Sequence, residues 1–138
     1  MLRSLFSIIA AVIIGLTVAK FVEGGGAALW SEGEPPLAGD QPVSASYNVV
    51  LAIGWMAGAF AAATTALLLG RRWAPLGWLG GACIFFSACI AMMTFSLSWV
   101  LWPVAALVTA AGAFAAIKLL KATTAHPAAM AEKELFGD

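Results

Sequence analysis

Lys20 and Glu23 are the ionisable residues that come closest to the interior of an apolar segment of this sequence. A spacing of three places them on neighbouring parts of one helical face, where they can form an ion pair. The pair can mark the end of a membrane span, with the lysine stem reaching outward to the headgroups. Alternatively, Glu23 can face a helix bundle and bind a cation or a polar ligand. Three glycines follow Glu23, and an unwound backbone there would offer carbonyl oxygens to such a ligand.

The other reactive side chains predict no catalytic or cofactor site. His126 is the only histidine, and one histidine cannot supply both axial ligands of a membrane haem. Cys83 and Cys89 are six residues apart on one expected helix, which is too far for a disulfide, and no neighbouring residues complete a metal site. The apolar segments contain no base that could activate a serine or threonine. We therefore expect no enzyme activity, no metal and no cofactor.

Composition predicts that these residues belong to a membrane protein. Hydrophobic residues make up 62% of the 138 residues and charged residues only 10%, whereas soluble domains average about 45–50% apolar and about 25% charged residues. The formal net charge is zero, so the chain lacks the basic surface that nucleic-acid-binding proteins use. We expect a lipid bilayer around the chain and no nucleic-acid partner.

Four apolar segments are long enough to cross a hydrocarbon layer of about 30 Å, which takes about 20 helical residues. They cover residues 5–22, 49–69, 78–95 and 99–120, and Pro103 places the regular part of the last helix from about Trp102 onward. None shows the alternation of apolar and polar residues that a membrane β-barrel requires. The sequence therefore predicts an all-α fold, a membrane-embedded four-helix bundle within residues 1–123. One alternative remains, a signal peptide cleaved after Ala19.

The cations predict the orientation of this bundle. With four crossings, Lys20 lies on the side that also collects Glu23, Glu32, Glu34 and Asp40, and the remaining lysines and arginines lie on the opposite side. Lysine and arginine are enriched on the cytoplasmic side of membranes. Both termini are therefore predicted to lie in the cytoplasm, and the protein is expected to be a multi-pass protein of a bacterial inner membrane.

The aromatic residues agree with this arrangement, because tryptophan and tyrosine favour the two headgroup layers of a membrane. Only Trp55 lies well inside a predicted span. The others fall at predicted helix ends, on the outer side Trp30, Tyr47, Trp99 and Trp102 and on the inner side Trp73 and Trp78.

The connections predict one exposed outer loop over residues 24–46, rich in glycine, proline and acids. Residues 96–98 form a link so short that the third and fourth helices must be antiparallel neighbours. Residues 124–138 are polar enough for a cytoplasmic tail, with a short amphipathic helix as one option over residues 128–136.

Small residues recur every three or four positions in each span, a pattern that lets helix backbones approach closely in lipid. Gly54 and Gly58 form a GxxxG pair, which can pack within the monomer or form a homodimer contact. The glycines expected at helix contacts are Gly15, Gly54, Gly58, Gly80 and Gly112. The bulky side chains expected to face lipid or another protein are Phe85, Phe86, Met92 and Met93.

Several short stretches resemble a loose group of small four-helix bacterial integral membrane proteins of unknown function. They are MLRSL at the start, FVEGGG at the end of the first span, GEPPLAGDQP in the outer loop and GWMAGAF in the second span. The most specific of these positions are Glu23, Trp55, Gly58 and Phe60. Members of the group often carry a histidine soon after the glutamate, where this chain has Gly25 and Gly26. The resemblance covers about residues 1–120 and implies a four-helix fold without an activity.

Two functional hypotheses follow from these observations. The first is a non-catalytic structural or accessory subunit that packs against itself, as a homo-oligomer, or against a larger membrane complex. It is based on the charge-free spans and the small-residue helix faces. The second is a small transporter, similar in size to the four-helix multidrug exporters, in which Glu23 binds the substrate.

Overall fold

The computed structural model describes residues 2–30, 44–95 and 97–125. Within these ranges the fold is all-α, with helices α1 (Leu2–Trp30), α2 (Ala45–Leu69), α3 (Ala74–Thr94) and α4 (Leu101–Leu119). Each helix is long and apolar enough to cross a membrane, so the predicted all-α, four-helix class is confirmed. Most of the expected outer loop, His126 and the optional helix over residues 128–136 lie outside the described residues.

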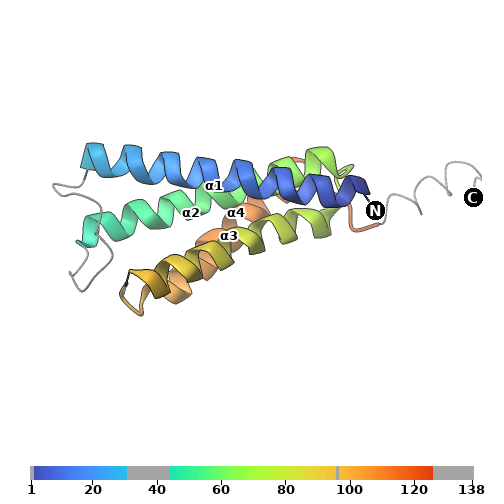
Figure 1. Cartoon of the computed structure of the whole chain (residues 1–138). Helices are drawn as coiled ribbons and strands as arrows, with labels where there is room; N and C mark the ends of the chain where they lie inside the picture. Colours follow the sequence, from blue (N-terminus) through green and yellow to red (C-terminus); the bar gives the residue numbers. More distant parts are fainter. Residues whose placement is uncertain (1, 31–43, 96, 126–138) are drawn as a thin grey trace, which may run out of the picture.

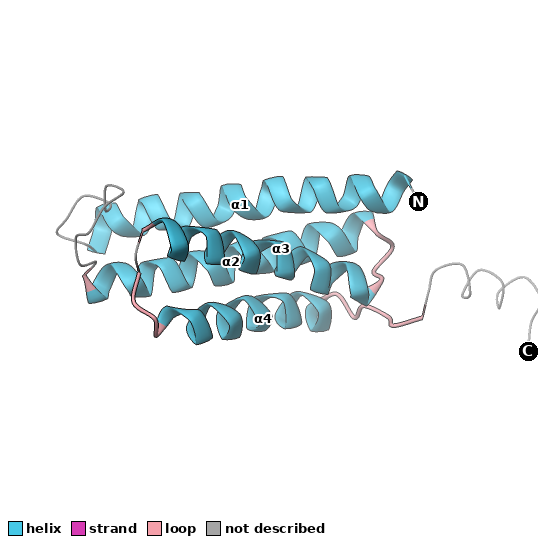
Figure 2. Cartoon of the chain, turned by 60° about the horizontal axis from the view of Figure 1, so that its bottom comes forward, coloured by secondary structure: helices cyan, strands magenta, loops and turns pink. Residues whose placement is uncertain are grey.

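The helices form an elongated bundle in which α2 and α3 separate α1 from α4 (Figure 1). The view in Figure 2 shows α1 and α4 on opposite sides of this central pair, and in the described ranges these two helices make no contact. Because successive helices are antiparallel, the carboxyl end of α1 lies beside the amino end of α2. We call this end of the bundle the Glu23 end and the opposite one the Arg71 end.

Local sequence signals explain where the helices begin. The Ser44 side-chain oxygen caps α2 by accepting a hydrogen bond of 3.3 Å from the Tyr47 backbone N–H. Pro75 lies in the first turn of α3, where a missing N–H is tolerated. Both helices therefore begin before the predicted residues 49 and 78, because the apolar runs exclude the polar cap and the first turn. Helix α4 begins at Leu101, with Pro103 in its first turn.

Helix α1 does not end near residue 22 but continues through the three glycines to Trp30. The backbone therefore does not unwind after Glu23, and the free carbonyl oxygens that the ligand-binding alternative would use are not present there. A side-chain carbon at Gly26 would lie 2.7 Å from Val50 of α2, so the last turns of α1 pack closely against the second helix. Tertiary contact of this kind overrides the weak helix propensity of glycine.

Glycines bring α1 and α2 into backbone contact near the middle of the bundle. A side-chain carbon at Gly15 would lie 2.9 Å from the Gly58 carbonyl oxygen, and one at Gly58 would lie 2.8 Å from the Gly15 carbonyl oxygen. Gly54 lies against the Ala19 carbonyl oxygen in the same way, at 3.1 Å. The GxxxG pair thus packs within the monomer, on α1.

Two further glycines join the other helices to α2. A side-chain carbon at Gly80 of α3 would lie 3.1 Å from the Ala62 backbone, and one at Gly112 of α4 would lie 2.5 Å from the Met56 carbonyl oxygen. All five glycines expected at helix contacts are buried. Helix α2 is therefore the common packing surface for the other three.

The bulky residues of α3 divide between the outside and the inside. Phe86 and Met93 are 66% and 75% exposed, as expected for side chains that face lipid. Met92 is buried and Phe85 packs against the buried cluster beside it, so the expectation that both face outward is wrong. Adjacent helical residues point in directions about 100° apart, and a bulky pair therefore cannot lie entirely on one face.

Three residues with a left-handed backbone conformation lie in the turns at the Arg71 end of the bundle. Arg71, Arg72 and Lys121 have positive φ angles of 57°, 56° and 49°. Arg71 and Lys121 each follow the C-cap residue of a helix, Gly70 and Leu120 respectively, the position where a left-handed residue commonly ends a helix. The Thr123 N–H donates to the Arg72 carbonyl at 2.9 Å, and the Thr123 carbonyl accepts from the Ala74 N–H at 2.9 Å. These bonds tie the segment after α4 to the turn between α2 and α3.

Candidate functional site

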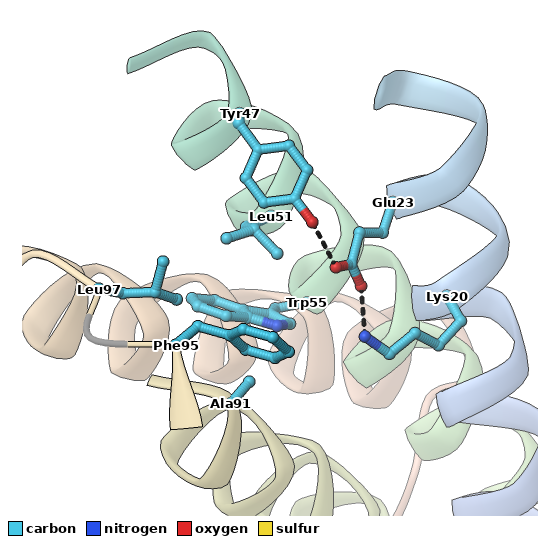
Figure 3. A pocket seen from close by; sticks show the side chains of 8 residues that line it. All are labelled: Lys20, Glu23, Tyr47, Leu51, Trp55, Ala91, Phe95 and Leu97. Carbon is cyan, nitrogen blue, oxygen red and sulfur yellow. Dashed lines mark hydrogen bonds and ion pairs between the residues drawn. The ribbon is translucent and has the colours of Figure 1, made fainter. Parts of the chain in front are cut away.

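A cavity of about 200 Å³ lies near the Glu23 end, between α1 and α3, with α2 along one wall. Figure 3 shows the side chains that surround it. They come from α1, α2, α3 and the α3–α4 connection: Lys20, Glu23, Tyr47, Leu51, Trp55, Ala91, Phe95 and Leu97. The cavity combines one carboxylate, one ammonium and three aromatic rings with small and aliphatic side chains.

Glu23 holds two hydrogen bonds in this cavity. Its Oε2 accepts from the Lys20 ammonium at 2.7 Å, and its Oε1 accepts from the Tyr47 hydroxyl at 2.9 Å. The Glu23 side chain is only 17% exposed, whereas that of Lys20 is 67% exposed. The carboxylate is therefore anchored to α2 by a buried phenol and neutralised by a cation that remains largely in solvent.

Helical periodicity places these groups together. Lys20 and Glu23 share one face of α1 because they are three residues apart. Tyr47, Leu51 and Trp55 follow one another at intervals of four along α2, so they line a single stripe of that helix. The Ser44 cap fixes the first turn of α2 and with it Tyr47. The stripe turns toward α1 and places the phenol opposite the carboxylate.

The aromatic rings lie on one side of the ion pair. Tyr47 and Trp55 are 6% and 5% exposed and belong to one buried cluster, against which Phe95 packs. Figure 3 shows the Lys20 ammonium directed toward the Trp55 and Phe95 rings, with the indole nitrogen on the side of Trp55 that faces it. The ammonium that pairs with Glu23 therefore lies at the edge of a cavity that is also lined by aromatic rings.

The carboxylate lies near one end of the apolar span of α1. That span begins at Ser4, and the rise of 1.5 Å per residue places Glu23 about 30 Å farther along the helix. This distance equals the approximate thickness of a hydrocarbon layer. Trp55, ten residues into α2, extends the cavity toward the interior of the bundle. The cavity therefore extends from the ionisable pair Lys20 and Glu23 toward the apolar interior of the bundle at Trp55.

The structure brings together the two site residues expected from the sequence. Lys20 is exposed, as expected for a lysine that reaches outward, while Glu23 faces the bundle. Tyr47 lies in the first turn of α2, at a helix end as expected, and its ring is buried and bonded to Glu23. Trp99, Trp102 and Trp78 are exposed at helix ends, as expected.

Sequence reasoning did not assign Tyr47, Trp55 and Phe95 to the site. One signal was present: Trp55 is the only tryptophan well inside a span, and it lies eight residues after Tyr47 on the same helical stripe. A buried tryptophan or tyrosine usually requires a polar partner for its N–H or O–H group. The position of Phe95 gave no such signal, because it depends on how α3 ends.

A second, apolar groove runs between α2 and α4. It is lined by Asn48, Val49, Ala52, Ile53, Met56, Leu101, Val104 and Val108. The Asn48 side-chain oxygen is buried and accepts no hydrogen bond from the described part of the chain. Cys83 and Cys89 are free thiols on α3.

Comparisons of the chain with protein-family models, with curated proteins and with solved structures found no match.

Proposed function

We propose that this chain is a non-catalytic integral membrane protein that crosses a bacterial inner membrane four times, with both termini in the cytoplasm. The four long apolar helices support the crossings. The distribution of cations supports the orientation, because Arg71, Arg72, Lys118 and Lys121 all lie at the Arg71 end, where α1 also begins. Lys20 is the one lysine that the structure describes at the Glu23 end. An excess of lysine and arginine marks the cytoplasmic side.

Within this arrangement we propose that the protein acts as a small transporter in which Glu23 binds the substrate. The observation that carries the proposal is the cavity itself, in which a mostly buried carboxylate is held by Tyr47 and lies beside Trp55 and Phe95. Ionisable residues within membrane-spanning helices usually belong to substrate or ion pathways. The sequence alone favoured an accessory role, and the cavity is the reason for placing transport first.

The Glu23→Gln variant tests this proposal, because glutamine keeps the shape of the side chain and removes its charge. Cells that produce the chain would be compared with cells that produce the variant for growth in toxic organic cations, and the purified proteins for uptake into proteoliposomes. We expect the variant to lose both effects. Lys118→Met, at the Arg71 end, is the matched control and should retain them. If the Glu23→Gln variant retained every transport and resistance effect, Glu23 would not be the substrate site.

The second candidate function is the accessory subunit, and the groove between α2 and α4 favours it. A buried amide oxygen without a donor is costly, and a hydrogen-bond donor on a partner helix seated in the groove would satisfy Asn48. Val108→Trp would fill this groove, whereas Leu107→Trp would add the same ring at a neighbouring position that is 71% exposed. We expect native mass spectrometry in mild detergent to show a defined oligomer or complex that only Val108→Trp disrupts. A monomer in every sample would count against this role.

A further inference from the structure

The Glu23 carboxylate in this cavity already pairs with a cation, the Lys20 ammonium, and this cation belongs to the protein. We propose that the cavity binds a compact organic ammonium ion, of about the size of tetramethylammonium or a choline headgroup, in exchange for Lys20. The proposal rests on the transporter function proposed above and names the class of its substrate. Lys20 then acts as a tethered competitor that pairs with the Glu23 carboxylate while no substrate is bound.

The groups around the cavity select a cation. The Glu23 carboxylate supplies the negative charge, and the rings of Tyr47, Trp55 and Phe95 supply aromatic surfaces within the same cavity. Aromatic rings attract ammonium groups through their quadrupoles, and cages of such rings are a common means of recognising quaternary ammonium ions. An anion entering here would meet the carboxylate without a second cation, since Lys20 is the only positively charged side chain among the described lining residues.

Lys20 can leave the cavity at little cost. Its side chain is 67% exposed, so a change of rotamer is enough to move the ammonium from Glu23 into solvent. Exposed ion pairs contribute little to stability. One positive charge leaves as another enters, and the charge of the cavity is therefore unchanged. Tyr47 continues to donate its hydroxyl to Oε1, which keeps the carboxylate in position during the exchange.

The volume of the cavity limits the size of the cation. At about 200 Å³ the cavity is smaller than the roughly 300–1,000 Å³ of sites for drug-sized ligands. A lipophilic drug cation with several rings would not fit without displacing Trp55 or Phe95. A headgroup with methyl substituents fits, and its methyl groups would contact Leu51, Ala91 and Leu97.

Binding of tetramethylammonium chloride to the full chain in phosphatidylglycerol nanodiscs tests the proposal, because these discs contain no lipid ammonium group. Isothermal titration at constant ionic strength should show saturable binding. Lys20→Met removes the competitor and should tighten binding about three- to five-fold, the effect expected for the loss of one exposed ion pair. Glu23→Gln should weaken binding at least about ten-fold. Lys118→Met changes a lysine beside Phe114 at the other end and should leave binding unchanged.

Two results would overturn the proposal. Weaker binding by Lys20→Met would mean that the ligand needs the lysine, as an anion or a zwitterion does. Equal affinities of the wild type and Glu23→Gln would place the ammonium elsewhere. Should Glu23→Gln not fold, Phe95→Leu takes its place, since it removes one ring and leaves the ion pair intact. It should weaken binding about three-fold, and an unchanged affinity would contradict the aromatic cage.

The ammonium group can come from a lipid headgroup or from a free ion, and the choice of lipid distinguishes the two. Two kinds of nanodisc contain the same fraction of phosphatidylglycerol, so that their surface charge is equal, and their remaining lipid is either phosphatidylcholine or a glycolipid without an ammonium group. A headgroup ligand would compete in the phosphatidylcholine discs and lower the apparent affinity for tetramethylammonium, whereas a free-ion site would show the same affinity in both. The transport assay separates this inference from the proposed function. Glu23-dependent transport without ammonium binding would overturn only the inference, and ammonium binding without transport would overturn only the transporter function.

Discussion

The two halves of the bundle are packed by different kinds of residues. Around Gly15 and Gly58 the helix contacts are made mainly by glycine and alanine, with Ile84 and Leu76 beside them, and Ala59, Ala62 and Ala66 are completely buried. Toward the Glu23 end the core contains Tyr47, Trp55, Met92 and Leu97, and here the cavity remains. Small residues allow backbones to touch and leave no space between them. Large residues hold the helices farther apart and fill the space incompletely, and the cavity that contains the ionisable side chains Lys20 and Glu23 lies in this half.

Gly58→Leu should have the largest effect on stability, because it acts where backbones touch. A side-chain carbon at this position meets the Gly15 carbonyl oxygen at 2.8 Å and Ala19 at 2.8 Å. The Gly15 carbonyl oxygen belongs to the backbone and cannot move away by a change of rotamer, so a leucine at position 58 must push α1 away from α2. We expect a loss of about 3 kcal/mol or more in the free energy of unfolding, measured by unfolding in mixed detergent micelles containing dodecyl sulfate.

Gly24→Leu is the matched control for Gly58→Leu. It introduces the same side chain into the same helix pair, at a position where nothing lies within 4 Å. Leucine has the higher helix propensity, so this variant should be unchanged or more stable by up to about 1 kcal/mol. Equal destabilisation by both substitutions would show that close backbone packing does not hold the glycine half together.

Trp55→Ala should have the next largest effect, in the half packed by large residues. Replacing a buried tryptophan by alanine typically costs about 3–5 kcal/mol. Trp55 already borders a cavity, so it has fewer packing partners than a ring enclosed on all sides. We therefore expect about 2–3 kcal/mol in the same unfolding measurement. Trp55→Phe should recover more than half of this loss. A larger cost for Trp55→Ala than for Gly58→Leu would reverse the proposed contrast between the halves.

The same contrast explains how much of the fold could be predicted from the sequence. The positions of Gly15 and Gly58 could be predicted, because small residues at helical spacing are a pattern along one segment. The continuation of α1 through Gly24 and Gly26 could not, since it depends on contact with Val50 of another helix. The cavity could be predicted only in part: Lys20 and Glu23 are neighbours in sequence, whereas Tyr47 reaches Glu23 only after two helices pack together.

Tyr47→Phe and Lys20→Met test a smaller difference within the Glu23 half. Each variant removes one hydrogen-bond donor to Glu23 and keeps most of the side chain's volume. The phenol is buried, so its loss leaves a carboxylate oxygen without a donor and should cost about 1–2 kcal/mol. The exposed ammonium should contribute less than about 1 kcal/mol. Equal losses of unfolding free energy would indicate that burial does not separate the roles of the two donors.

Lys121→Gly should have the smallest effect, and the opposite sign. Lys121 follows α4 with a φ angle of 49°, a conformation that glycine adopts without strain. The relief of this strain is partly offset by the greater freedom of glycine in the unfolded chain, so we expect a gain of about 0.5–1 kcal/mol in the free energy of unfolding. Lys121→Ala removes the same charge and keeps the strained angle, and it should give no gain. If both variants were equally stabilised, repulsion among the cations at the Arg71 end would be the cause. The stability of the Arg71 end would then depend mainly on charge repulsion, whereas the stability of the Glu23 end depends mainly on packing.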